Sequence, residues 1–340
     1  MKVALLYYRY GRSMFAEALP RYPGIDEVQG WHKSVGRLED FDIIILSAFA
    51  GLEPGAPGYK SEANISIVLD YLENNTLWDR IVIWDERADW NLWKWGIDRV
   101  SVYFKKSWPT DKERILREKK DEPWPEKVHY LGWPVLDLYA AIPHDLYHNR
   151  DIDIGCYFGY QKENRLTSRR RNLLGAVVTF DWGHDSCIEL TNTCGGQYQG
   201  HNLYHKEPMV GGKFNWWHVY MQLLRRTKII FTSPGYPGFF GADRRTAEAV
   251  SSGALVFTDE PNIQMPYPFE HGKHLFFFDA HSDKALNDAM ELAKQYLLPE
   301  RKEEREAIAK ACVEHALEHH RTDNYVAYAM DIIKKGKGWD

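Results

Sequence analysis

The 340-residue sequence contains no long apolar run, only four cysteines and no common nucleotide-binding fingerprint. No stretch approaches the roughly 18 apolar residues that a membrane-spanning helix requires. The first residues, Met1 to Leu6, lead into tyrosines and Arg9, which is not the pattern of a cleavable signal peptide. These absences predict a cytoplasmic protein without a membrane span.

The cysteines are too few to stabilise a chain of this length through disulfides, and none shows C-x-x-C spacing. They are Cys156, Cys187, Cys194 and Cys312. We expect four free thiols, and the thiols give no indication of a metal site.

Motifs of two large nucleotide-binding classes are missing. The loop at residues 9–13 holds one glycine, so it has no G-x-G-x-x-G, and G-x-x-x-x-G-K-[ST] occurs nowhere. NAD-dependent enzymes and P-loop NTPases are therefore disfavoured. The net charge of -5 gives no general attraction to nucleic acid or anionic membranes. Nucleic-acid binding is not expected, and any anion site has to be local.

Short apolar runs alternate with helical patterns along the chain, which predicts an α/β fold. Runs without polar alternation are typical of parallel strands that are covered on both faces. The expected strands are 2–8, 41–46, 81–84, 101–104, 128–131, 154–158, 187–191, 229–232 and 255–258. The expected helices are 14–19, 64–72, 168–178, 214–226, 244–252, 285–297, 304–319 and 324–335.

A polar stretch at residues 143–153 separates two halves of the pattern and predicts a linker between domains. We expect a first domain at 1–148, a second at 149–320 and a final helical segment at 321–340. A chain of this length is large enough for two ordinary domains.

The most informative stretch, residues 228–260, reads as strand, loop, helix and strand. Ligands of parallel sheets bind beyond the carboxyl ends of the strands, where the loop with Ser233 and Gly235 is expected. Arg244 and Arg245 occupy the first helical turn, where the helix dipole disfavours cations and a bound diphosphate would remove the conflict. Glu248, one turn further on, is an acceptor for sugar hydroxyls. Alternatively, Arg244 and Glu248 form a solvated pair worth about 0.3 kcal/mol.

The residues Asp-Arg-Arg-Thr-Ala-Glu-Ala, followed by Ser-Ser-Gly-Ala-Leu-Val-Phe-Thr-Asp, resemble the R-T-x-E-A-x-x-x-G-A segment of GT-B glycosyltransferases. The resemblance is closest to the CgeB-like spore maturation group and more distant to exostosin-like enzymes. It continues through residues 269–275 and on to His320 and Arg321. It implies two Rossmann-like domains whose parallel sheets face each other across a cleft, with a last helix able to cross back to the first domain.

A second segment, Tyr-Phe-Gly-Tyr followed by Arg-Arg-Arg-Asn-Leu-Leu, resembles the opening of the C-terminal domain in the same group. The resemblance implies that Gly159, Tyr160 and Arg170 lie near the donor nucleotide. Glycine allows the backbone to approach a ligand, and arginine binds phosphate. Alternatively, residues 169–171 form a solvated helix face.

Acidic residues follow the strand expected at 81–84, at the ligand edge of the first sheet. In an inverting transfer, Asp85 or Glu86 would take the proton of the acceptor hydroxyl, and His32 is a second candidate base. Alternatively, the two carboxylates pair with Arg87.

None of the possible metal ligands forms a convincing site. Asp151 and Asp153 match D-x-D, but they precede a strand instead of following one. His201 and His205 are four residues apart in a glycine-rich region that reads as a loop. His315, His319 and His320 fall at a helix C-terminus, where the dipole favours imidazolium. We expect neither a metal nor a cofactor.

The resemblance implies a metal-independent hexosyl- or pentosyltransferase of glycan biosynthesis. Its partners would be a nucleotide-diphosphate sugar donor and a glycan or other hydroxyl acceptor. A sugar-nucleotide epimerase of the same architecture and a catalytically inactive GT-B binding module are the alternatives. The donor sugar, its nucleotide, the acceptor, the anomeric outcome and the oligomeric state stay open.

Overall fold

The computed structural model divides the chain into two compact units. Unit 1 comprises Met1–Pro134, Asn262–Met265 and Thr322–Asp340, and unit 2 comprises Val135–Pro261 and Pro266–Arg321. The boundary expected after residue 148 falls inside unit 2. Within the units, the structure describes residues 1–6, 14–30, 37–48, 71–85, 97–105, 126–132, 134–135, 150–157, 168–183, 186–192, 199–202, 216–233, 244–260 and 265–338.

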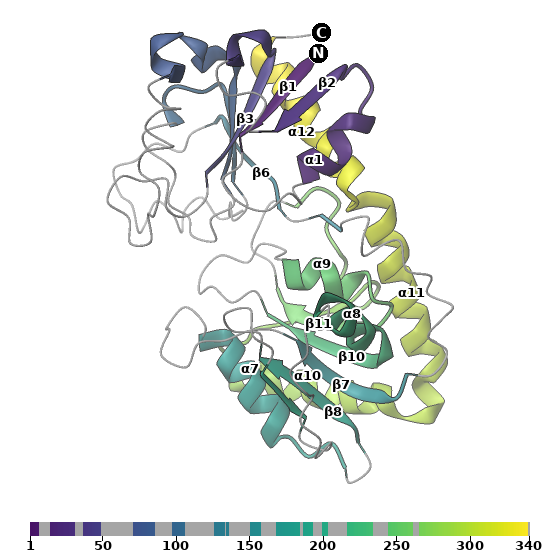
Figure 1. Cartoon of the computed structure of the whole chain (residues 1–340). Coiled ribbons are helices and arrows are strands. Elements are labelled where there is room, and N and C mark those ends of the chain that lie inside the picture. Colours follow the sequence, from purple (N-terminus) through teal and green to yellow (C-terminus); the bar gives the residue numbers. More distant parts are fainter. Residues whose placement is uncertain are drawn as a thin grey trace. The chain divides into compact units, whose positions relative to one another are not determined.

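Unit 1 is built on a six-stranded parallel sheet with the order β2-β1-β3-β4-β5-β6 (Figure 1). Its register pairs Val3 with Ile43, Ile45 with Val82 and Trp84 with Phe104. The strands are β1 Lys2–Leu6, β2 Glu27–Gly30, β3 Ile43–Ala48, β4 Ile81–Asp85, β5 Val102–Lys105 and β6 Val128–Tyr130.

Both faces of this sheet are buried, because successive side chains of a strand point to opposite sides. Ala4 and Leu6 belong to one core cluster, which also contains Leu72 and Leu77. Val3 and Leu5 belong to the other, which lies against α1 and α12. The helical elements with described bounds in unit 1 are α1 Met14–Ala18, η1 Leu19–Arg21, η2 Leu38–Asp40, η3 Leu77–Arg80 and α12 Thr322–Lys337, and residues 71–74 are also helical.

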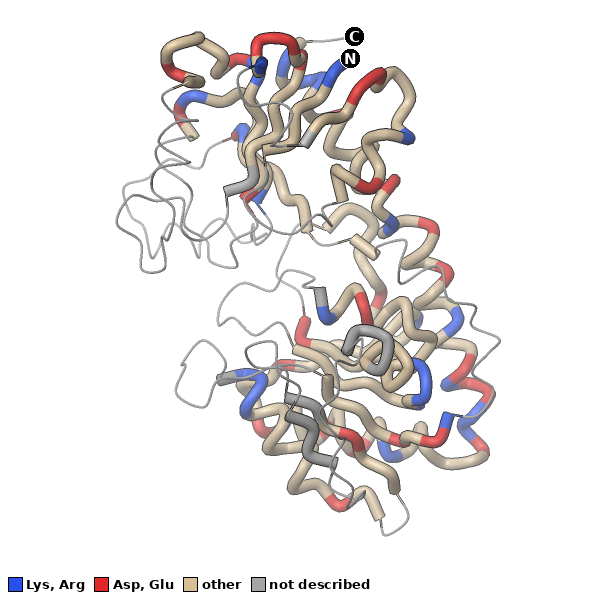
Figure 2. The backbone as a smooth tube through the Cα atoms, in the orientation of Figure 1, with Lys and Arg blue, Asp and Glu red and all other residues tan. Residues whose placement is uncertain are grey.

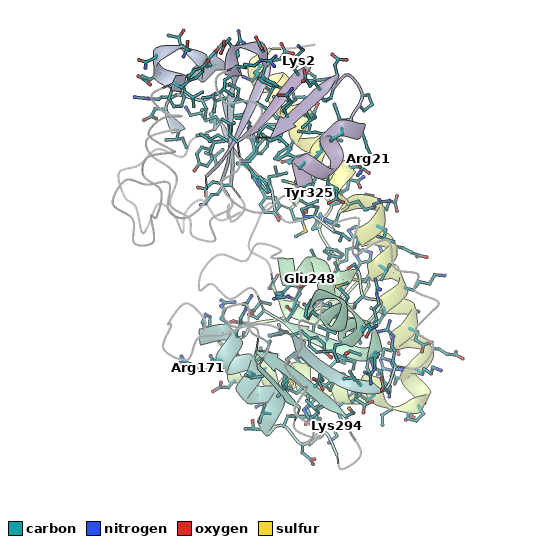
Figure 3. All side chains as sticks on the ribbon, in the orientation of Figure 1. Lys2, Arg21, Arg171, Glu248, Lys294 and Tyr325 are labelled. Atoms are coloured by element: carbon teal, nitrogen blue, oxygen red, sulfur yellow. The ribbon has the colours of Figure 1, made fainter. Side chains whose placement is uncertain are left out.

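The last helix of the chain, α12, lies in unit 1 beside α1 (Figure 1). Its apolar face includes Tyr325, Val326 and Met330, which are buried among strand residues of the sheet. Tyr325 is labelled in Figure 3. Arg21 Nη2 lies 2.7 Å from Asp323 Oδ1 and links η1 to the start of α12. The hydrophobic stripe of α12 therefore completes the core of the unit that contains the N-terminus.

Unit 2 has a six-stranded sheet with the order β12-β11-β10-β7-β8-β9. Strands β12, β11, β10, β7 and β8 are parallel, as expected, and β9 pairs antiparallel with β8 at one edge. The predicted linker ends too late, since β7 begins at Ile152. The strands are β7 Ile152–Tyr157, β8 Ile188–Asn192, β9 Gln199–Asn202, β10 Thr227–Thr232, β11 Leu255–Asp259 and β12 Phe276–Phe278.

Helices cover both faces of the unit 2 sheet. On one face, α7 Ser168–Thr179 and α10 Asp283–Leu297 pack over Ile229 and Phe231 of β10. On the other face, Ile230 packs with α8 Trp216–Arg226, α9 Arg244–Val250 and α11 Lys302–His319. The 3-10 helix η7 Pro299–Arg301 connects α10 to α11.

Local sequence signals fix several helix ends. Ser282 caps α10, and its hydroxyl accepts a hydrogen bond from the Ala285 amide at 3.2 Å. Gly253 follows α9 with a φ of 75°, a left-handed conformation that glycine adopts without strain. Within the described ranges, no helix is both long enough and apolar enough to cross a bilayer.

Candidate functional site

The strand order of unit 2 reverses between its neighbouring parallel strands β7 and β10. From β7, the chain continues to β8 on one side and later returns to β10 on the other. In open α/β sheets, ligands bind beyond the carboxyl ends of the strands at such a switch point. Tyr157 and Thr232 end the two strands, so the following residues are candidate ligand contacts.

Two arginines from the first turn of α7 make side-chain contacts at this edge of the sheet. Figure 2 shows the beginning of α7 in the blue of Lys and Arg. Arg170 Nε donates a hydrogen bond of 2.7 Å to the carbonyl of Ser233, directly after β10. Arg169 Nη1 lies 3.1 Å from Asp259 Oδ1 at the end of β11. Three elements are thereby joined at the carboxyl edge, and two guanidinium groups are held there.

Asp259 is the centre of these contacts. Besides Arg169, it accepts hydrogen bonds from the Ser233 hydroxyl and, at 2.8 Å, from the Ala280 amide. Burial raises the pKa of Asp259, although the hydrogen bonds from Ser233 and Ala280 and the charge of Arg169 oppose that rise. Its carboxylate is fully engaged as a support for the edge.

A second cluster involves α9 and α8. Glu248 Oε2 accepts hydrogen bonds from Arg245 Nη1 at 2.8 Å and from the Tyr220 hydroxyl at 2.6 Å. Glu248 is completely buried, so the interpretation as a solvated surface pair is wrong for this side chain (Figure 3). The described cation beside it is Arg245, while the side chain of Arg244, the first residue of α9, lies outside the described residues.

In unit 1, Asp85 ends β4 as expected, but its carboxylate is completely buried. Asp85 Oδ2 accepts hydrogen bonds from the Tyr103 hydroxyl at 2.6 Å and from Lys105 Nζ at 3.0 Å. Glu86, Arg87 and His32 lie outside the described residues. The expectation that Asp85 faces a ligand does not fit this burial, and the described cation beside it is Lys105.

Several other predicted positions also lie outside the described part of the chain. Gly159, Tyr160 and Gly235 belong to the segments that follow β7 and β10. Of the expected donor-side residues, the structure brings together Arg170 with Ser233, and separately Arg245 with Glu248.

The carboxylates of the D-x-D pair bind cations of the protein instead. Asp151 Oδ1 accepts a hydrogen bond from Arg226 Nε at 2.8 Å, and Asp153 Oδ1 lies 2.6 Å from Lys228 Nζ. His201 lies in β9 and not in a loop, and His205 lies outside the described residues. Among the residues with described positions, no group of three or more His, Cys, Asp or Glu side chains can hold a metal ion.

The sequence did not reveal four of the residues that matter here. The sequence left open that Arg169 belongs to a solvated helix face, but the structure buries this residue, which is only 8% exposed. Asp259 follows an apolar run directly, and this position at the ligand edge is a usable signal. Tyr220 and Lys105 sit inside apolar helix and strand patterns, which give no indication of their buried polar contacts.

Comparison with known protein families adds to this geometry. Residues 165–331 match the model of a family described as glycosyl transferase-like. The matched region contains both site clusters, from Arg169 to Asp259, but not Gly159 and Tyr160. It confirms the resemblance to glycosyltransferases that the sequence motifs indicate. A comparison with curated protein sequences finds no significant match.

The fold is that of GT-B glycosyltransferases. HepE of Anabaena in complex with UDP-glucose has a TM-score of 0.55 at 12% identity, covering 97% of this chain and 99% of that chain. An alpha-glucosyltransferase in complex with UDP and a 13-mer DNA has a TM-score of 0.59 at 11% identity, covering 98% and 99%. A glycosyltransferase from Rickettsia africae has a TM-score of 0.52 at 10% identity, covering 98% of both chains.

These comparisons confirm the predicted fold class of two Rossmann-like α/β domains. At such low sequence identity, structural similarity shows that the fold is shared but does not identify the substrate of this protein. Because one of the similar structures contains DNA, the exclusion of nucleic acid stays a prediction from net charge.

Proposed function

We propose that this protein transfers a sugar from a nucleoside-diphosphate sugar to the hydroxyl group of a glycan or another acceptor. The observation that carries the proposal is the pair Arg169 and Arg170, fixed at the switch point of unit 2 by Asp259 and Ser233. These residues lie within the region that matches the glycosyl transferase-like family.

The electrostatics of the switch point suit a diphosphate leaving group. When the bond between sugar and diphosphate breaks, negative charge develops on the leaving phosphate, and preorganised cations stabilise it. Guanidinium groups bind phosphate oxygens two at a time. Arg169 and Arg170 supply this chemistry at the edge, and Arg245 adds a third cation from α9. Similar folds have been determined with UDP, so UDP-sugars are the first donors to test.

The catalytic base is proposed among the residues expected in the first domain. Asp85 has no exposed surface and already binds Lys105 and Tyr103. We therefore prefer Glu86 or His32 as the group that takes the proton of the acceptor hydroxyl. Whether the donor sugar is a hexose or a pentose is decided by donor screening.

The test is a screen of UDP-, GDP-, ADP-, CDP- and dTDP-sugars by thermal stabilisation and by release of nucleoside diphosphate. Arg170→Ala should then weaken nucleotide binding about tenfold or more, since one charged phosphate contact is worth about 1.4 kcal/mol or more. Arg171→Ala is the matched control, because Arg171 belongs to the same turn but its side chain is exposed. It should leave the affinity within about twofold of wild type, which corresponds to about 0.4 kcal/mol.

Two outcomes would contradict the proposal. If no nucleotide sugar stabilises the wild-type protein, the inactive binding module becomes the better reading. If a nucleotide sugar is converted equally with and without acceptor into an isomeric nucleotide sugar, the protein is an epimerase.

Transfer should also proceed without a divalent metal. In many glycosyltransferases a metal held by D-x-D neutralises the diphosphate, but here Asp151 and Asp153 neutralise Arg226 and Lys228. Arginines can supply the same charge. Turnover with the identified donor should therefore be unchanged in EDTA. Loss of turnover in EDTA and its recovery with Mg²⁺ or Mn²⁺ would refute metal independence.

A further inference from the structure

Three side chains of unit 2 form one connected group, but they differ in access to solvent. Tyr220 comes from α8, and Arg245 and Glu248 come from α9. Glu248 is 0% exposed and Tyr220 is 2% exposed. The side chain of Arg245 is 18% exposed. A ligand approaching from solvent therefore meets Arg245 before the other two.

The two buried side chains hold the guanidinium in two ways. Glu248 Oε2 binds Arg245 Nη1 at 2.8 Å and the Tyr220 hydroxyl at 2.6 Å. The Arg245 guanidinium carbon also lies 4.8 Å from the centre of the Tyr220 ring, a cation–π contact. Tyr220 thus contacts both charged partners, one through its hydroxyl and one through its ring face.

The protonation states agree with this arrangement. Burial raises the pKa of the Tyr220 hydroxyl well above its usual value, so the hydroxyl remains a donor. Burial alone would lower the pKa of Arg245, but Tyr220 and Glu248 outweigh burial, and the pKa is raised. The guanidinium is therefore charged under all ordinary conditions.

We propose that Tyr220 and Glu248 are positioning residues, and that Arg245 is the member of the group that contacts the diphosphate of the donor. This inference rests on the proposed function. It differs from the interpretation of Glu248 as a direct acceptor for the sugar hydroxyls of the donor, because a fully buried carboxylate that already receives two donors is a support for its neighbour.

Positioning matters because an unsupported arginine loses much side-chain freedom when it binds a ligand. Here the salt bridge and the ring contact have already restricted Arg245 before binding. A cation held in place also stabilises developing negative charge without reorganisation. Removing either support should therefore weaken diphosphate binding even though neither residue touches the ligand.

The two roles of Glu248 predict different ligand dependences, which a ligand without a sugar can separate. Calorimetric titration with UDP, and displacement of UDP by inorganic pyrophosphate, are measured for wild type, Glu248→Gln and Tyr220→Phe. If both residues act through Arg245 on the diphosphate, each variant binds UDP and pyrophosphate about tenfold or more weakly. The binding stoichiometry should stay at the wild-type value.

Tyr157→Phe is the control for general damage to this core. Tyr157 is equally buried, lies edge-on to Tyr220 with ring centres 6.2 Å apart, and bonds through its hydroxyl to Thr227. This variant should lower the melting temperature and leave both affinities unchanged. A purely structural role for Tyr220 would give the same result, or a reduced binding stoichiometry at normal affinity.

A coupling experiment tests whether Tyr220 acts through Arg245. In an Arg245→Met background, Tyr220→Phe should cause no further loss of affinity, because the group being positioned is already absent. Additive losses would overturn the inference. So would weaker UDP binding with unchanged pyrophosphate affinity in Glu248→Gln, which would make Glu248 a direct contact of the uridine, whose ribose is the sugar present in UDP. Failure of pyrophosphate to displace UDP from wild type would also overturn it, since the diphosphate would then not be the group that is held.

Failure of the proposed function is distinguishable from failure of this inference. Absence of UDP binding by the wild-type protein would overturn both. Normal UDP and pyrophosphate affinity in Tyr220→Phe, with binding by wild type intact, would overturn the inference alone.

Discussion

Among the described residues, each unit has a buried carboxylate with one oxygen that accepts hydrogen bonds from both a cationic side chain and a tyrosine hydroxyl. In unit 1, Asp85 Oδ2 binds Tyr103 at 2.6 Å and Lys105 at 3.0 Å. In unit 2, Glu248 Oε2 binds Tyr220 at 2.6 Å and Arg245 at 2.8 Å. The chemical composition of the two groups is nearly the same, so their difference lies in the position of the cation.

Lys105 is completely buried, whereas the side chain of Arg245 is 18% exposed. In unit 1 both charged side chains are enclosed, and the group joins the ends of β4 and β5. In unit 2 the cation reaches the surface from a similar buried support. Under the inference above, the same arrangement supports the fold where its cation is enclosed and diphosphate binding where its cation is accessible.

The enclosed group of unit 1 should be the more sensitive of the two to loss of its cation. Lys105→Met leaves the Asp85 carboxylate buried without a positive charge, and breaking a buried ion pair from one side costs about 3–5 kcal/mol. Urea denaturation at pH 7 should show this loss as a lower free energy of unfolding. This is the largest effect that we expect.

The control is an exposed ion pair of the same unit. Arg37 Nη2 lies 2.8 Å from Asp40 Oδ2, and both side chains are largely in solvent. Arg37→Met should have little effect, because exposed pairs gain little from charge attraction in water. Equal destabilisation by the two variants would show that burial does not set the value of the Lys105 pair, and the distinction between the units would lose its physical basis.

Apolar periodicity allowed most of the central fold to be predicted. Strands such as Ile81–Asp85 and Leu255–Asp259 are buried at every position. Each sequence is an apolar run that becomes polar only at its carboxyl end. The missed strands are short or polar. Glu27–Gly30 lies at a sheet edge, where one side lacks a partner strand and an apolar pattern is not required. Phe276–Phe278 is only three residues long.

The part of the candidate site at the ends of strands could be predicted from the sequence. The part that depends on how separate helices pack against each other could not. Ser233 and Arg170 follow from motif and topology, and the structure brings them within hydrogen-bond distance. The burial of Glu248 does not follow, because its acidic side chain on a short helix suits a solvated face equally well. Tyr220 is brought to it from α8, and no spacing rule relates side chains of two separate helices.

Histidines provide a second contrast between the units. Burial lowers the pKa of His129 in unit 1, where it lies beside Phe104. In unit 2, burial and the neighbouring histidines lower the pKa of His320 from 6.5 to about 3. Its Nε2 is 2.8 Å from the carbonyl of Tyr267, and its ring stacks on Phe269. The charges that act on the His320 imidazole are those of His315, His319 and His274, while Lys273 and Glu270 act on His274 and His315.

A lowered pKa in the folded state makes unit 2 sensitive to acid. The unfolded chain takes up protons at His320 below pH 6.5, while the folded protein takes them up only near pH 3. The stability that neutral His320 contributes is therefore complete above pH 6.5 and is lost progressively below it. At pH 5 the loss is about 2 kcal/mol, from 1.5 pH units at about 1.36 kcal/mol each.

His320→Gln should reduce the difference in unfolding free energy between pH 7 and pH 5 by about that amount, namely 2 kcal/mol. The glutamine retains a donor for the Tyr267 carbonyl but does not titrate. The exposed His281 gives the control, and His281→Gln should keep the wild-type pH dependence. An unchanged pH dependence in His320→Gln would mean that His320 is not a source of acid sensitivity.

The smallest effect gives the most direct test of the comparison, because it removes the same atom from both units. Tyr103→Phe and Tyr220→Phe each delete one hydroxyl donor to a buried carboxylate. Each should lower the free energy of unfolding by about 1–2 kcal/mol, since a hydrogen bond to a charged group is lost while the ring still fills its space. Only Tyr220→Phe should weaken UDP binding, because only in unit 2 does the supported cation have exposed surface. Urea denaturation and calorimetry on the same two preparations measure both quantities. If Tyr103→Phe weakened UDP binding as much as Tyr220→Phe does, the exposure of the cation would not separate the binding group from the structural one.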